Sequence, residues 1–135
     1  GWHSDMTRTV CVGKPSDKMK SVYETVLNAQ LSALDAVKAG MSGKELDKIA
    51  RDIITEAGYG DNFGHSLGHG VGVEIHESPY ASPSREDILP ENSIVTVEPG
   101  IYLEGKFGVR IEDFVVVTEN GCINMTKAPK ELICL

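Results

Sequence analysis

Apolar residues recur every three or four positions along two stretches of the chain, and this spacing predicts two amphipathic helices. The first stretch covers residues 19–37, after a candidate N-cap at Ser16 and before a glycine stop at Gly40. The second follows SGKE at 42–45, which matches a capping box, and ends at Gly58. We expect the two helices to lie antiparallel because the connection between them is short.

Runs rich in β-branched residues predict strands on both sides of the helices. They cover residues 5–12, 93–97, 109–117 and a short tail at 131–135, with a polar loop expected over 80–92. The turn-like segment LEGKFG separates the second and third strands, so these two should form an antiparallel hairpin. One strand, two helices and then mostly antiparallel strands make an α+β layer pattern.

The segment HSLGHGVGVEIHESP at 65–79 holds three of the four histidines of the chain. Its glycines disfavour a helix interior, so we expect a strand or an extended loop. Glycine within a strand often marks a bulge or the close approach of a ligand or a second backbone. The segment is therefore a candidate site, although a single histidine such as His69 is more often structural.

Composition and charge narrow the class of protein. With 41% hydrophobic and 24% charged residues, the chain has the composition of one ordinary globular domain. Thirteen basic and twenty acidic residues give a net charge of -7 without a basic stripe, so we expect no nucleic-acid partner. Apolar runs of about five residues are too short for a membrane span. Three cysteines without a CxxC motif suit a reducing compartment, and we expect a cytoplasmic protein.

Two carboxylates are expected to meet in the hairpin. If its turn is centred on Gly105, facing positions sum to 210, which places Glu98 opposite Glu112. Like charges in that position are destabilising, so the pair needs a metal cation, a shared proton or solvent exposure, and Arg110 could supply part of the compensation. Most of the acidic residues of the helices are expected to be solvated surface groups, in the set Asp17, Glu24, Asp35, Asp47, Asp52 and Glu56.

An imidazole with several carboxylates and no thiolate is a ligand set for Mn, Fe, Co or Zn. Two such ions held close together can bind a hydroxide and polarise a carbonyl at the same time, which implies hydrolysis.

Four motifs together resemble the pita-bread metallopeptidases, a family that includes methionine aminopeptidase, aminopeptidase P and prolidase. They are SDMTRT at 4–9, GHSLGHGVGVEIHESP at 64–79, TVEPGIY at 96–102 and GVRIEDFVVVT at 108–118. The upstream histidine of HSLGH and the arginine of VRIED favour the proline-directed branch. The resemblance implies half of a pita-bread fold, with two antiparallel helices packed on a curved, mostly antiparallel sheet.

The resemblance also implies a metal centre. Asp5 and Glu112 would bridge two divalent ions, and His69 and Glu98 would bind one of them. Manganese is the expected metal, with cobalt, zinc or iron as alternatives.

The same resemblance assigns roles around the metals. Glu98 would also shuttle a proton from the bridging water to the proline nitrogen. His65 and His76 would line the substrate site and stabilise the developing oxyanion. Arg110 would orient Glu112 or Asp5.

By the same resemblance, residues 1–135 correspond to the C-terminal part of a catalytic domain. The family's first ligand, an aspartate in a D-x-G motif, would precede the start of the chain. We therefore expect a peptidase that hydrolyses Xaa-Pro bonds through a hydroxide bridging two metals, with the chain alone weak or inactive. A creatinase-like hydrolase without metal and a non-catalytic peptide-binding module are the alternatives. An exposed sheet edge and helix face predict a homodimer or self-association of the chain.

Overall fold

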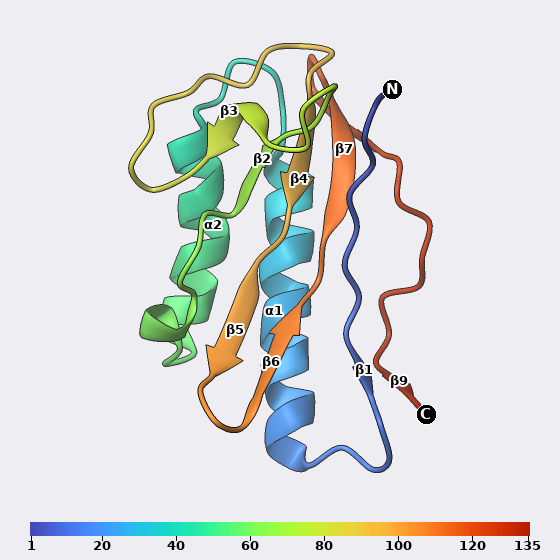
Figure 1. Ribbon diagram of the computed structural model, residues 1–135. Coiled ribbons are helices and arrows are strands. Elements are labelled where there is room, and N and C mark those ends of the chain that lie inside the picture. Colours follow the sequence, from blue (N-terminus) through green and yellow to red (C-terminus); the bar gives the residue numbers. More distant parts are fainter.

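In the computed structural model, which describes residues 1–135, the two amphipathic stretches form helices α1 (Asp17–Ala36) and α2 (Gly43–Glu56). The side chain of Ser16 accepts a hydrogen bond from the N–H of Met19, and Ser42 and Glu45 form the expected capping box. The helices run antiparallel (Figure 1). The predicted stop at Gly40 is four residues late, because α1 ends at Ala36 and Gly40 supplies a left-handed φ of 84° in the connection. Neither helix combines the length and apolar character that crossing a membrane requires.

The main sheet has five strands in the order β3-β2-β4-β7-β8, and every neighbouring pair is antiparallel. Its strands are β2 (Gly68–Gly70), β3 (Glu77–Ala81), β4 (Ile94–Val97), β7 (Asp113–Thr118) and β8 (Gly121–Asn124). A hairpin of β5 (Gly100–Leu103) and β6 (Phe107–Arg110) continues this sheet. A parallel pair, β1 (Val10–Cys11) and β9 (Ile133–Cys134), lies beside it. A short 3-10 turn, η1 (Gly60–Asn62), follows α2.

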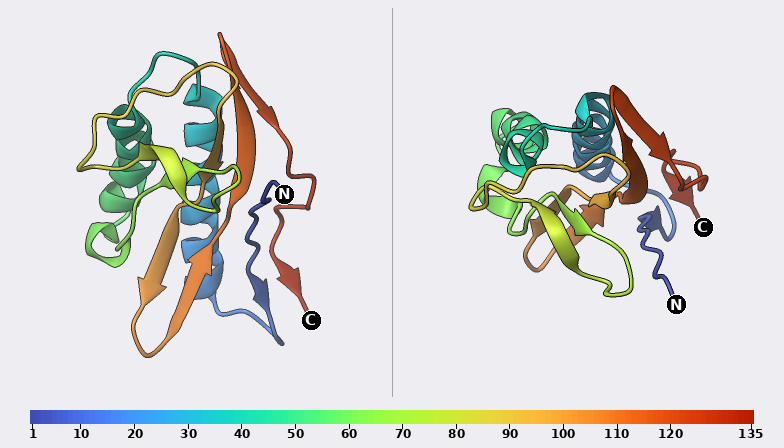
Figure 2. Two further views of the ribbon diagram at one scale, coloured as in Figure 1. Left: turned by 45° about the horizontal axis from the view of Figure 1, so that its top comes forward. Right: turned by 90° about the horizontal axis from the view of Figure 1, so that it is seen from above.

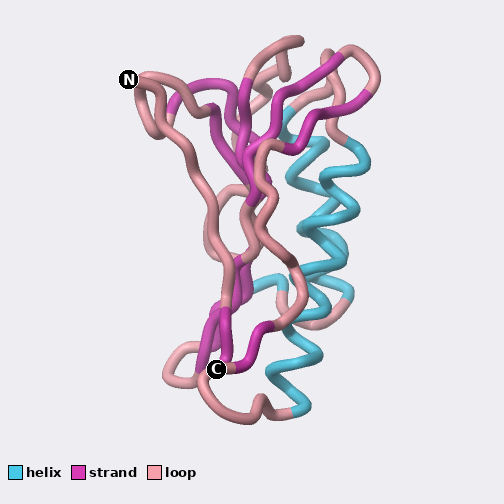
Figure 3. The backbone as a smooth tube through the Cα atoms, turned by 90° about the vertical axis from the view of Figure 1, so that its right-hand side faces the viewer, coloured by secondary structure: helices cyan, strands magenta, loops and turns pink.

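The elements form layers around one core. Both helices cover one face of the sheet, and the N- and C-terminal segments run along the opposite side (Figures 2 and 3). The core fills the space between helices and sheet, and its members include Val22, Val26, Leu46, Ala50, Ile54, Val95, Val97, Val115 and Val117. Each fully buried Leu or Ile side chain among them contributes about 2 kcal/mol through the apolar surface removed from water.

The hairpin has the predicted register, since Ile101 faces Val109 and Leu103 faces Phe107. The prediction of one continuous strand over 109–117 is wrong, because the strand is interrupted between β6 and β7. Pro99 has no N–H to donate there, so only the bond from the N–H of Ile111 to the carbonyl of Pro99, at 3.4 Å, crosses the ribbon at this point. On its other side, Glu112 pairs with Thr7 of the N-terminal segment.

Three other predicted boundaries also shift. The strand expected over 5–12 shrinks to β1 and the isolated bridge at Thr7, because only these points have a backbone partner. The polar loop begins after Ala81 rather than at Tyr80, since β3 pairs with β2 up to that residue. The tail strand is limited to Ile133 and Cys134 by the two-residue length of β1.

Candidate metal centre

The candidate centre lies where the long ribbon of β4–β5 and β6–β7 is interrupted. Glu98 and Glu112 occupy facing positions there, between the paired residues Val97 and Asp113 on one side and the β5–β6 hairpin on the other. Their side chains therefore meet across the ribbon, as the predicted register requires.

Two further chain segments flank the ribbon at the interruption. The N–H of Glu98 donates to the carbonyl of Leu67 at 2.8 Å, two residues before His69. Glu112 exchanges backbone hydrogen bonds with Thr7, two residues after Asp5. The Glu98 bond continues the pairing of β4 with β2, and the Glu112 bonds lie on the other outer side of the ribbon, so the two flanking segments bring His69 and Asp5 next to the two glutamates.

The three carboxylates lie around His69. His69 Nε2 lies 3.1 Å from Glu98 Oε1 and 3.6 Å from Asp5 Oδ2. Donor atoms of His69, Glu98 and Glu112 all lie within 4.8 Å of one another, and those of Asp5, His69 and His76 form a second such group. Residues from four separate segments of the chain thus present one shared set of nitrogen and oxygen donors.

The hydrogen bonds of His69 fix which ring nitrogen faces the carboxylates. Nδ1 lies 2.9 Å from the carbonyl oxygen of Gly70, which can only accept, so Nδ1 carries a hydrogen. Nε2 is left to face Glu98. Thr96 ties the pair together, because its hydroxyl accepts from the N–H of His69 and donates to Glu98, both at 3.0 Å.

The electrostatics of this point favour a cation. Burial raises the pKa of Glu112 to about 7, and the charges of Glu98 and Asp5 act in the same direction against a hydrogen bond from Thr7. Burial would also raise the pKa of Glu98, yet its contacts with His69 hold it below the ordinary value. Burial alone disfavours a charged His69, but the hydrogen bonds to Glu98 and Gly70 raise its pKa. One imidazole and three carboxylates crowded in this way fit divalent ions such as Mn, Fe, Co or Zn.

Arg110 reaches the centre through a threonine. Its Nε donates to the hydroxyl of Thr7 at 3.0 Å, and that hydroxyl donates to Glu112 Oε2. Arg110 therefore restrains Glu112 indirectly.

A cleft of about 420 Å³ opens beside these residues and is lined by His65, Ser66, Gly68, His69, His76, Tyr80, Glu98 and Arg110. The two histidines with predicted substrate roles occupy different parts of it. The His76 ring lies 4.2 Å from that of His69, close enough to Asp5 to add another nitrogen donor. His65 Nε2 lies 2.7 Å from the hydroxyl of Tyr102 instead.

The sequence profile of metallopeptidase family M24 matches residues 1–119. The chain belongs to metallopeptidase family M24.

Relatives of this M24 chain are similar over nearly its whole length. An Xaa-Pro dipeptidase of Pyrococcus furiosus is 55% identical over 132 residues, which make up 98% of this chain and 38% of that protein. The structure of an Xaa-Pro dipeptidase from Bacillus anthracis superposes with a TM-score of 0.97 at 54% identity, covering 99% of this chain and 38% of that one. The structure of an X-Pro aminopeptidase from Thermotoga maritima superposes with a TM-score of 0.96 at 53% identity, and the match covers 99% of this chain and 38% of that one.

These similarities confirm the resemblance stated from the motifs. They also confirm the α+β class and the pita-bread arrangement of two helices on a mostly antiparallel sheet. The chain spans about 38% of the length of these relatives.

Asp47 is an exception among the acidic residues of the helices, most of which were expected to be solvated. Asp47 is buried and accepts from both Arg51 Nε and Nη2, at 2.7 and 2.9 Å, and from the N–H of Leu67 at 3.0 Å. Arg51 also donates to the carbonyls of Phe63 and His65. The pair anchors the segment that leads into the cleft, and its i, i+4 spacing on α2 is the signal that could have revealed it.

The sequence did not predict the roles of Thr7, Thr96 and Arg8. Thr7 and Thr96 each stand two residues from a ligand candidate, on the same strand face, and this alternation could have indicated them. Arg8 has no such local signal, because its partners lie more than one hundred residues away in the sequence.

Proposed function

We propose that this chain provides the metal-binding part of a peptidase that hydrolyses Xaa-Pro bonds, with Asp5, His69, Glu98 and Glu112 holding two divalent ions, manganese first among them. The observation that carries the proposal is that three carboxylates, each from a different chain segment, lie around the single imidazole of His69. Relatives named Xaa-Pro dipeptidase at 49–55% identity support the substrate class.

The chain's own residues suit this chemistry. When bound by these residues, a pair of divalent ions would supply a hydroxide nucleophile and would polarise the scissile carbonyl. Glu98 is placed to accept a proton from the attacking water and to return it to the leaving proline nitrogen. His76 and His65 line the cleft, where each can hydrogen-bond the peptide carbonyl or the oxyanion that develops from it.

The supporting groups keep the donors in place. Thr96 orients both His69 and Glu98, while Arg110 acts on Glu112 through Thr7. A creatinase-like hydrolase would have no use for this donor set, and metal analysis of the full-length protein distinguishes the two functions.

We further propose that the 135-residue chain alone hydrolyses little. It spans 38% of the length of its relatives, and no D-x-G motif occurs within it. A purified chain that turns over an Xaa-Pro dipeptide rapidly with added Mn²⁺ would contradict this part of the proposal.

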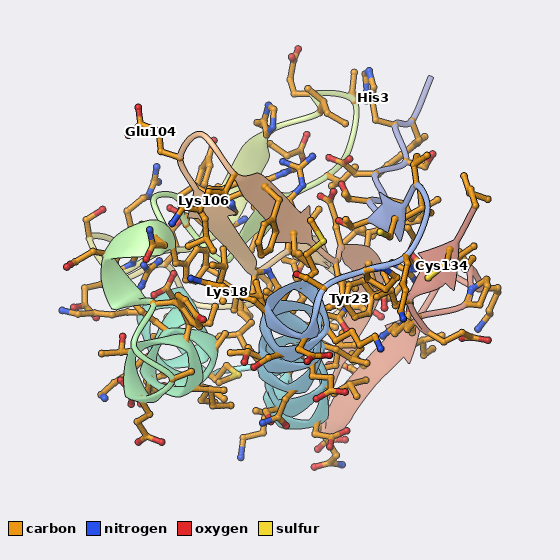
Figure 4. All side chains as sticks on the ribbon, turned by 90° about the horizontal axis from the view of Figure 1, so that it is seen from below. His3, Lys18, Tyr23, Glu104, Lys106 and Cys134 are labelled. Atoms are coloured by element: carbon orange, nitrogen blue, oxygen red, sulfur yellow. The ribbon has the colours of Figure 1, made fainter.

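Calorimetric titration of the chain with Mn²⁺ tests the centre itself. Glu112→Gln keeps the size of the side chain and removes its charge, and we expect at least a 10-fold rise in the dissociation constant. Glu104→Gln is the matched control, because Glu104 is exposed on the β5–β6 turn and points away from the body of the protein (Figure 4). Equal affinities for the two variants would overturn the assignment of the centre.

A further inference from the structure

Two of the three cysteines lie directly opposite each other on neighbouring strands. β1 and β9 run parallel, and their register pairs Cys11 with Cys134 (Figure 1). Cys134 is exposed and Cys11 is partly exposed, and both are free thiols. Figure 4 shows Cys134 on β9 at the surface, next to the N-terminal strand. The two thiols are separated by nearly the whole sequence but share one edge of the fold.

The backbone on either side holds this register. Beyond the cysteines, the N–H of Leu135 donates to the carbonyl of Cys11 at 2.8 Å, and the N–H of Gly13 donates to the carbonyl of Leu135 at 2.7 Å. Before them, Arg8 donates to the carbonyls of residues 128 and 129, both at 2.9 Å. The hydroxyl of Tyr23 on α1 donates to the carbonyl of Lys130 at 2.7 Å. The pairing is therefore fixed from both ends by contacts that do not involve sulfur.

The spacing between β1 and β9 suits a disulfide bond between Cys11 and Cys134. Neighbouring strands lie about 4.8 Å apart, which falls within the range of roughly 4.4–6.8 Å between Cα atoms of disulfide-bonded cysteines. Directly paired residues also present their side chains on the same face of a sheet. Because β1 and β9 are two residues long and lie at the edge of the fold, small adjustments of the strands disturb no long ladder.

We propose that Cys11 and Cys134 are a dithiol site that closes to an intramolecular disulfide by exchange with a small-molecule disulfide such as oxidised glutathione. The thiolate of exposed Cys134 attacks one sulfur of glutathione disulfide, forms a mixed disulfide and releases one glutathione thiolate. The thiolate of Cys11 then attacks the sulfur of Cys134 and releases the second glutathione. Two protein thiols are oxidised by two electrons, the reagent disulfide is reduced to two thiols, and the protons of the protein thiols pass to the leaving thiolates.

The third cysteine is excluded from this chemistry by its position. Cys122 lies on β8 opposite Val117, and its thiol donates to the carbonyl of Leu34 at 3.5 Å. Burial raises the pKa of the Cys122 thiol, which lowers its reactive thiolate fraction. The proposed bond would tie the strand that follows Asp5 and Thr7 to the tail of the chain.

The wild-type chain treated with oxidised glutathione provides the test, read by intact mass and thiol titration under denaturing conditions. We expect the mass to fall by two hydrogen atoms, the free thiols to fall from three to one, and peptide mapping to join Cys11 to Cys134. The yield should not depend on protein concentration. Cys122→Ser should still form the bond, whereas Cys134→Ser should give no loss of mass.

Two results would overturn the proposal. One is a persistent glutathione adduct on Cys134 while Cys11 stays free, which would mean that the second thiol cannot reach the first. The other is a disulfide between two copies of the chain through Cys134. Neither result bears on metal binding, so this test stands apart from that of the proposed function.

Discussion

Replacing Arg8 with methionine removes the guanidinium that joins three segments of the chain and keeps an unbranched stem of similar length. Arg8 Nη1 donates to the carbonyls of Thr7 and Glu112, at 2.9 and 2.8 Å, and Nη2 donates to Asp113 Oδ1 at 2.7 Å. Further bonds reach the carbonyls of Ala128 and Pro129. The side chain of Asp113 is fully buried, so it depends on these partners for its charge.

The expected loss of stability depends on the partners that Asp113 keeps after the substitution. Breaking a buried ion pair by removing one partner typically costs about 3–5 kcal/mol, because the other charge is left uncompensated. Asp113 keeps Lys130 at 2.6 Å and Asn124 at 2.7 Å, which places the expected loss at the lower end, about 3 kcal/mol. Backbone carbonyls that lose their donor add to this loss only where water cannot replace it.

Urea unfolding of wild type and Arg8→Met measures this difference in the free energy of unfolding. The slope of that free energy against urea concentration should be the same for both proteins. Lys44→Met is the control, because Lys44 forms an exposed ion pair with Glu86 and such pairs contribute about 0–1 kcal/mol. A loss for Arg8→Met no larger than that of Lys44→Met would refute the role of Arg8 as the junction of the three segments.

Three further predictions concern other parts of the molecule. Thr96→Val should lower the free energy of unfolding by about 1–3 kcal/mol, since it leaves a buried N–H of His69 unpaired, and Thr96→Ser should recover most of it in the same urea assay. The hydrogen bond from the N–H of Tyr80, helped by Arg85 and Ser78, holds the pKa of Asp87 below its ordinary value of 3.8. The stabilisation that the Asp87 carboxylate contributes is therefore complete above its ordinary pKa and is lost as the pH falls below it. The free energy of unfolding should therefore decline less steeply at acidic pH in Asp87→Asn than in the wild type. Exposed apolar side chains that directly follow β1 and β9, Val12 and Leu135, should promote self-association, and light scattering that shows a monomer at all concentrations would contradict this.

The sequence by itself determined the elements whose signals are local. Helix periodicity and the serine caps depend on residues three or four apart, and both helices form where those signals predict them. The β5–β6 hairpin depends on one turn, and the position of Gly105 in that turn was enough to place Glu98 opposite Glu112. Four short motifs, taken in their order and spacing, were enough to indicate the family that the profile match confirms.

Tertiary structure decided everything that depends on contacts between distant segments. Thr7 comes to Glu112 from more than one hundred residues away, and the burial of Asp47 depends on the segment around Leu67 that packs against it. Arg8 and the facing cysteines have partners more than one hundred residues away. No periodicity or turn signal encodes such pairings, because the free energy that selects them comes from packing of the whole chain and from the few buried charges that packing must satisfy.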